Sequence, residues 1–156
     1  MPGRGESFNV YIFRDTGPLG ILTNPNRNPA AKQWYAAMIV AGHTFIVPSI
    51  ADYEVRRELV RAGKTAGLAE LDAFISVPGR YLELTDSALK RAATFWADVR
   101  NAGYQTADNR ELDCDALIAA QAKDFGLPDT EYAVATVNVG HLNQFVSAVD
   151  WKTLAP

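Results

Sequence analysis

The sequence has few residues that form cross-links or bind zinc. Its 156 residues include one cysteine, Cys114, and two histidines. A single cysteine cannot form an internal disulfide, which favours a reducing, intracellular setting. One thiol with two distant imidazoles also gives no zinc-ligand spacing. The sequence therefore argues against a disulfide-stabilised secreted domain and against a structural zinc domain.

Long apolar runs and an excess of positive charge are also missing. No stretch approaches the ~18 uninterrupted apolar residues of a membrane span, and the polar first residues do not resemble a secretion signal. We expect a cytoplasmic protein with no membrane segment. The formal net charge is -3, so a nucleic-acid partner would need a local basic patch or bound metal to offset the acids.

What the sequence does contain is an alternation of β-rich and helical segments. A chain of this length points to one domain. Strands alternating with helices predict an α/β fold with a parallel sheet that is covered on both faces. We predict strands over 9–13, 44–47, 81–84 and 132–135, with a short fifth strand within 143–151, and helices over 19–23, 29–41, 50–62, 68–75, 85–102 and 116–125, with a polar loop over 104–111.

Oxygen-bearing side chains follow the predicted strands. Asp15 comes just after the first strand, and Glu54 lies in the first turns of the helix after the second. Asp113 and Asp115 open the helix before the fourth strand, and Asn138 follows that strand. Open α/β sheets bind ligands at the carboxyl ends of their strands. Clustered carboxylates repel one another, and Mg²⁺ or Mn²⁺, which prefer oxygen ligands, would remove that repulsion.

Each of these residues also has an ordinary structural interpretation. Asp15 precedes Thr-Gly-Pro and could form an Asx turn. Asp115 is well placed as a helix N-cap, and Glu54 could pair with Arg57 along one helix face. Asn138 could occupy a turn. Only their joint placement favours a metal site.

Four segments in order resemble the motifs of the PIN domain family, in particular the VapC-type toxin nucleases of bacterial toxin–antitoxin pairs. They are YIFRDTGPLG at 11–20, VPSIADYEVRREL at 47–59, LDCDALIAAQA at 112–122 and VATVNVGHL at 134–142. The third is the most specific. The resemblance implies a three-layer α/β/α fold with a central parallel sheet of four to five strands. It spans residues 9–156 as one nuclease domain and leaves residues 1–8 as a flexible extension.

The resemblance also implies an activity. It predicts a metal-dependent ribonuclease in which Asp15, Glu54 and Asp115 hold one or two Mg²⁺ or Mn²⁺ ions. Thr16 and Thr136 would orient ligands or water. The fourth motif carries Asn138 rather than an acid, so either Asn138 or Asp113 completes the site. The implied partners are an RNA substrate and a small antitoxin protein. Apolar residues in the predicted helices over 29–41 and 68–75 could serve a homodimer, which we expect, or an antitoxin groove.

A basic stripe could contact the RNA. Arg57, Arg61 and Lys64 have i, i+4, i+7 spacing, which predicts one helix face. The alternative is a solvated face on which these arginines pair with Glu54 and Glu58.

Two other functions compete with the nuclease. A flavodoxin-like receiver domain also holds magnesium at strand ends, but it needs a pair of acids near the first strand and a lysine after the last. Asp15 has no acidic neighbour, and no lysine follows the fourth strand until Lys152. A degenerate PIN-like module that binds RNA or a protein without cleavage is the second alternative, and Asn138 is compatible with it.

Overall fold

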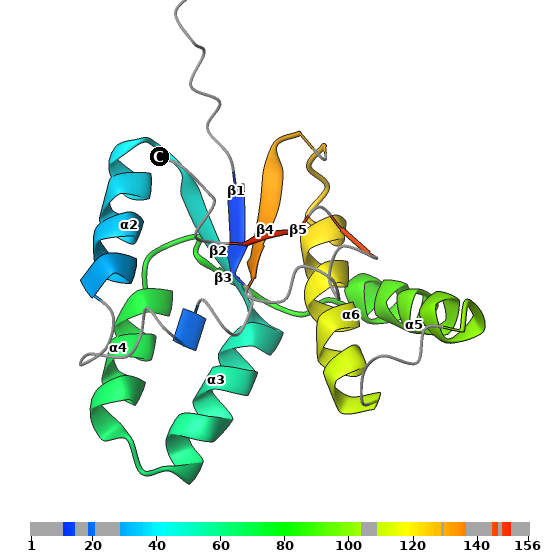
Figure 1. The fold of residues 1–156 in the computed structure, drawn as a ribbon, viewed down its shortest axis with the longest axis horizontal. Coiled ribbons are helices and arrows are strands. Elements are labelled where there is room, and N and C mark those ends of the chain that lie inside the picture. The colour runs from blue at the N-terminus through cyan, green and yellow to red at the C-terminus, as the bar shows by residue number, and fades with distance from the viewer. Residues whose placement is uncertain are drawn as a thin grey trace, which may run out of the picture.

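A five-stranded parallel sheet forms the centre of the molecule (Figure 1). The computed structural model describes residues 11–14, 19–20, 29–103, 109–128, 130–136, 145–146 and 148–150, with the backbone alone at 14 and 109–111. The strands lie in the order β3-β2-β1-β4-β5, and all four pairings are parallel. Their bounds are β1 (Tyr11–Arg14), β2 (Thr44–Pro48), β3 (Tyr81–Leu82), β4 (Tyr132–Thr136) and β5 (Ala148–Asp150). The predicted parallel sheet is confirmed.

The strand order creates a switch point between β1 and β4. From β1 the chain adds β2 and then β3 on one side, and it later places β4 and β5 on the other side. The connections on the two sides therefore diverge at the carboxyl ends of β1 and β4. Ligands of open α/β sheets bind in the crevice that forms at such a point.

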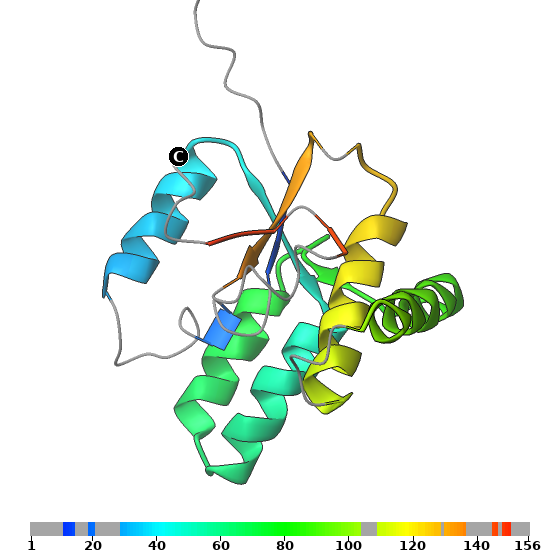
Figure 2. The ribbon, with the colours of Figure 1, turned by 45° about the vertical axis from the view of Figure 1, so that its right-hand side comes forward.

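Helices cover both faces of the sheet, which gives the three-layer arrangement (Figures 1 and 2). Side chains alternate along β1: Ile12 packs with the α2 residues Ala31 and Met38, and Phe13 packs on the other face with the α6 residue Ile118. All five of these side chains are buried. The helices of the described part are α2 (Pro29–Val40), α3 (Ser49–Arg61), α4 (Thr65–Ile75), α5 (Asp86–Asn101) and α6 (Asn109–Asp124).

Several helix ends lie where the sequence predicted them. Pro29 begins α2, and Thr85 is the N-cap of α5, where its Oγ1 accepts from the Ala88 N–H at 3.1 Å. Gly42 and Gly103 follow α2 and α5 with φ of 91° and 79°, a conformation in which other residues are strained. The segment predicted as a helix over 19–23 is helical at residues 19–20, and the rest of it lies outside the described residues.

The start of α6 differs from the prediction. Residues 109–111 were expected in a polar loop and Asp115 at the helix start, but α6 begins at Asn109, so Asp115 lies inside the helix and is not its N-cap. Leu112 and Ala116, one turn apart, are 5% and 1% exposed. Burial of this apolar face outweighs the polar composition, and Arg, Glu and Leu are themselves good helix formers.

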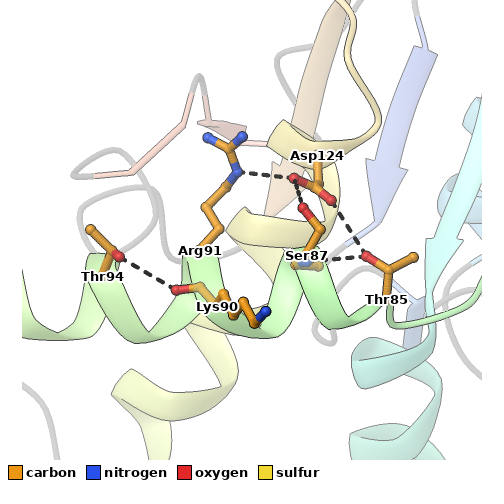
Figure 3. A network of polar contacts seen from close by, with 7 residues as sticks. Thr85, Ser87, Lys90, Arg91, Thr94 and Asp124 are labelled. Carbon is orange, nitrogen blue, oxygen red and sulfur yellow. Dashed lines mark hydrogen bonds and ion pairs between the residues drawn. The ribbon is translucent and has the colours of Figure 1, made fainter.

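A polar network joins α5 to the end of α6 (Figure 3). The Asp124 carboxylate accepts from Ser87 Oγ at 3.1 Å, Arg91 Nε at 3.1 Å and Thr85 Oγ1 at 3.4 Å. The hydroxyl of Ser87 contributes most to lowering the pKa of Asp124, and Arg91 and Thr85 act in the same direction.

In the part of the chain that the structure describes, no helix combines the length and the apolar character needed to cross a membrane.

Candidate active site

The carboxyl-end edge of the sheet, at the switch point, is where the predicted site residues that the structure describes can be examined. Arg14 of β1 is in register with Ala135 of β4, so Thr136 ends β4 at this edge, where its side chain is fully buried. Asp15 and Thr16 follow β1 in the sequence and Asn138 follows β4, but all three lie outside the described residues. Their roles stay predictions.

Glu54 reaches this edge from α3. The helix begins directly after β2, because Ser49 follows Pro48, and Glu54 lies in its second turn. The Glu54 side chain is 18% exposed, and its Oε2 lies 3.8 Å from the Arg57 Nη2. That separation is long for an ion pair, and the pair is partly exposed, so Arg57 neutralises the carboxylate only in part.

Asp115 and Cys114 bring α6 against Glu54. The Cys114 thiol hydrogen-bonds to the Glu54 carboxylate. Burial, followed by the charge of Glu54 and this hydrogen bond, raises the pKa of Cys114 to about 12; the charge of Asp115 adds to the rise, and Arg57 opposes it. Both carboxylates therefore act electrostatically on this thiol, Glu54 from α3 and Asp115 from the next position of α6. We expected Cys114 only as a packed thiol, and its contact with α3 was not foreseen.

Asp113 has different surroundings. Its side chain is exposed on α6, and residues two apart on a helix do not face each other. It therefore lies on another side of α6 from Asp115. Its share in metal binding stays a prediction.

The chemistry of the donors suits Mg²⁺ or Mn²⁺. Glu54 and Asp115 offer carboxylate oxygens, the ligands that these hard cations prefer. Burial is the main cause of the raised pKa of Cys114, and the charges of Glu54 and Asp115 add to it; the same charges would attract a cation. Among the described side chains, no three His, Cys, Asp or Glu residues form a group that could hold a metal ion. Of the three predicted acids, the structure describes Glu54 and Asp115, and Asp15 lies outside the described residues.

The predicted basic stripe on one helix is wrong. The helix α3 ends at Arg61, and Lys64 is the N-cap of α4, because Gly63 turns the chain with φ of 65°. Arg61 Nη2 pairs with Glu58 Oε2 at 2.9 Å, with both side chains largely exposed. The ion pairs of the alternative interpretation are thus present.

Arg57 remains beside the acids, held by an aromatic neighbour. Its guanidinium carbon lies 5.3 Å from the centroid of the Tyr53 ring, and Tyr53 is 56% exposed. The hydrogen bond between these two side chains is the main cause that raises the pKa of Arg57. An exposed ring with a fixed cation next to acids is a surface to which a nucleotide could bind. Tyr53 was not among the predicted site residues, although it directly precedes Glu54 in the sequence.

Known proteins support the fold. No family model and no curated protein matches the chain. A chain of FitAcB from Neisseria gonorrhoeae matches with a TM-score of 0.66 and 20% identity, over 92% of this chain and 99% of that chain. A chain of VapBC2 from Rickettsia felis, bound to a DNA fragment from its promoter, matches with a TM-score of 0.67 and 13% identity, over 91% of this chain and 99% of that chain. A chain of DNA-bound VapBC from Salmonella typhimurium matches with a TM-score of 0.59 and 16% identity, over 91% of this chain and 98% of that chain.

These similarities cover nearly the whole of each matched chain. At such identities they establish the fold: the chain has the PIN-like three-layer α/β/α fold of the VapC-type structures, as the sequence resemblance predicted. They leave the roles of individual residues open.

Proposed function

We propose that this protein is a metal-dependent ribonuclease that hydrolyses RNA phosphodiester bonds, acting as the toxin of a toxin–antitoxin pair. The observation that carries the proposal is the VapC-type fold, in which Glu54 lies on α3 and Asp115 on the packed helix α6. The charges of both acids contribute to the raised pKa of Cys114, which supports a shared acidic site. The four ordered sequence motifs support the same activity.

Glu54, Asp115 and Asp15 would hold the Mg²⁺ or Mn²⁺, with Asn138 or Asp113 as the further ligand. When bound, the metal would lower the pKa of a water molecule and stabilise charge on the leaving oxygen. The chain's own groups would position the substrate. Arg57, beside Glu54, would attract a phosphate to an otherwise acidic edge, and the exposed ring of Tyr53 would stack on a base. Thr136, buried at the end of β4, would orient ligands or water.

The test is RNA cleavage with a matched pair of variants. The purified protein is incubated with a panel of structured RNAs in Mg²⁺, Mn²⁺ or EDTA. We expect cleavage by the wild type with metal and none in EDTA. Asp115→Asn should lower the cleavage rate by at least about 100-fold, since it removes a charged ligand.

The matched control is Asp98→Asn, which changes an exposed aspartate of α5 away from the site. It should cleave like the wild type. Equal cleavage by the folded Asp115→Asn variant would refute the assigned site. Absence of Mn²⁺ binding by calorimetry, in a folded wild type, would favour the degenerate, non-cleaving module.

The proposed partner is a small DNA-binding antitoxin. The fold matches VapBC2, bound to DNA from its promoter, and FitAB, bound to a DNA fragment. A short adjacent reading frame encoding a DNA-binding protein should be present, and the two proteins should co-purify when produced together. Cell growth that is unaffected when the chain is produced alone would contradict the toxin role.

A further inference from the structure

We propose that Gln121 is a positioning residue that sets the approach of Glu54 to Asp115 by capping α3 from α6. The inference rests on the proposed function, because it concerns the same two acids. Gln121 lies on α6 among alanines and is 2% exposed. A buried amide in such a helix face needs polar partners, since an unsatisfied one is costly.

The side chain of Gln121 contacts two other elements through three hydrogen bonds. Its Nε2 donates to the Leu82 carbonyl oxygen in β3 at 3.0 Å and to Ser49 Oγ in α3 at 3.2 Å. Its Oε1 accepts from the Ile50 N–H at 3.4 Å. A backbone N–H can only donate and a carbonyl can only accept, so the set requires a side chain that offers both.

The start of α3 lacks a cap of its own. Its N-cap residue is Pro48, which makes no side-chain hydrogen bond to the helix. The first N–H groups of a helix have no partner within it and need one from elsewhere. The amide oxygen of Gln121 satisfies the N–H of Ile50, so the cap of α3 comes from a different helix. The position of α3 is thereby tied to that of α6.

Two polar contacts join α3 to α6, in addition to the apolar packing of the two helices in the main core. Gln121 holds the start of α3, and the Cys114–Glu54 hydrogen bond lies further along it. Cys114 comes before Gln121 on α6 whereas Glu54 comes after Ser49 on α3, so the helices run in opposite directions at this contact (Figure 1). Gln121 thereby contributes to where Glu54 lies relative to Asp115, which neighbours Cys114.

The test measures the interface without metal and then with it. Gln121→Met keeps the length of the side chain and removes every hydrogen bond. Cys114 is the only cysteine, so the reaction rate of an aromatic disulfide reagent in EDTA reports this interface alone. We expect the variant to react at least about tenfold faster, and its affinity for Mn²⁺, measured by calorimetry, to fall by about 10-fold or more. Ser49→Ala, which removes one acceptor, should shift both in the same direction by less, and it provides the test if Gln121→Met does not fold.

The control is Gln33→Met, which replaces an exposed glutamine of α2 and should leave both quantities unchanged. A folded Gln121→Met variant with a lower melting temperature, but wild-type thiol reactivity and Mn²⁺ affinity, would overturn the inference, because Gln121 would then only stabilise the fold. If the wild type binds no Mn²⁺, the proposed function fails, and the thiol reactivity alone decides whether Gln121 positions α3.

Discussion

At the scale of single residues, the exposed Tyr53 ring is the feature that most directly suggests a substrate. A cation held at 5.3 Å from an exposed ring, next to a carboxylate, joins a stacking surface to a phosphate-binding group. The chain carries a second pair of the same kind on α5, where the Arg100 guanidinium lies 5.5 Å from the Trp96 ring. The two pairs lie on different helices, and Tyr53 adjoins Glu54 in the sequence, so they can be compared directly.

Replacing Tyr53 by alanine should weaken RNA binding. Loss of one stacked base corresponds to about 1–3 kcal/mol, and we expect the dissociation constant, measured by fluorescence anisotropy in EDTA, to rise by about 5- to 100-fold, while Mn²⁺ affinity stays unchanged. Trp96→Ala is the control and should bind RNA like the wild type. Equal losses in both variants would show that binding does not centre on the acidic edge.

Buried apolar residues should dominate stability. Leu71 of α4 is fully buried in the main core, and Leu71→Ala should lower the free energy of unfolding by about 2–5 kcal/mol through lost burial and a cavity. Leu89, at 46% exposed on α5, provides the comparison. Urea unfolding should give a loss below about 1 kcal/mol for Leu89→Ala. Similar losses for the two variants would contradict the assigned core.

The placement of Glu54 near the start of α3 was predictable because it depends on local order along the chain. Glu54 follows a strand and opens a helix, and parallel strands present such positions at one edge. The Cys114–Glu54 and Gln121–Ile50 contacts were not predictable. They join residues far apart in sequence, and they depend on how α3 packs against α6, which no local pattern specifies.

At the scale of elements, the Asp124 network is the described polar link between α5 and the end of α6. Three donors favour the ionised carboxylate and lower its pKa, the Ser87 hydroxyl most. A group whose pKa is lower in the folded state stabilises it above the pKa of the unfolded chain, and this contribution is lost as pH falls through the folded value. The network therefore stabilises the fold at neutral pH and ceases to do so in acid.

Asp124→Asn should thus lower the melting temperature at about pH 7, and the difference from wild type should shrink as the pH falls below about 4. Thermal unfolding followed by circular dichroism from about pH 7 to about pH 3.5 measures this. Asp98→Asn, on the exposed side of α5, should change the melting temperature little at any pH. A difference that is the same across this range would show that Asp124 acts by packing and not by charge.

Most elements were predictable from periodicity and from their glycine and proline boundaries. The start of α6 was not, because polar residues over 109–111 are equally compatible with a loop until the burial of Leu112 is known. The prediction that Arg57, Arg61 and Lys64 share one helix face was wrong for a similar reason. A prediction from residue spacing holds only within one continuous helix, and the turn at Gly63 separates α3 from Lys64.

At the scale of the whole molecule, the charge balance constrains how RNA could bind. The chain has 18 acidic and 15 basic residues, and Arg57 is the cation described beside the predicted acids. Without metal, RNA binding should be weak and its salt dependence shallow. Titration in EDTA from about 50 to 200 mM salt should give a log–log slope of about -0.7 to -1.4, corresponding to one or two phosphates on a single strand. A slope steeper than about -3.5 would require a broad basic surface and would contradict this picture.

The order of the strands also bears on how the molecule is made. The central strand β1 is followed in the sequence by β2, β3 and the helices α2 to α6 before its other neighbour, β4. During synthesis β1 can pair with β2 early, but its other edge stays open until β4 has been added. Such distant pairing is slow to form. The edge formed by the carboxyl ends of β1 and β4 therefore does not exist until β4 has been synthesised, and any chemistry at that edge becomes available only then.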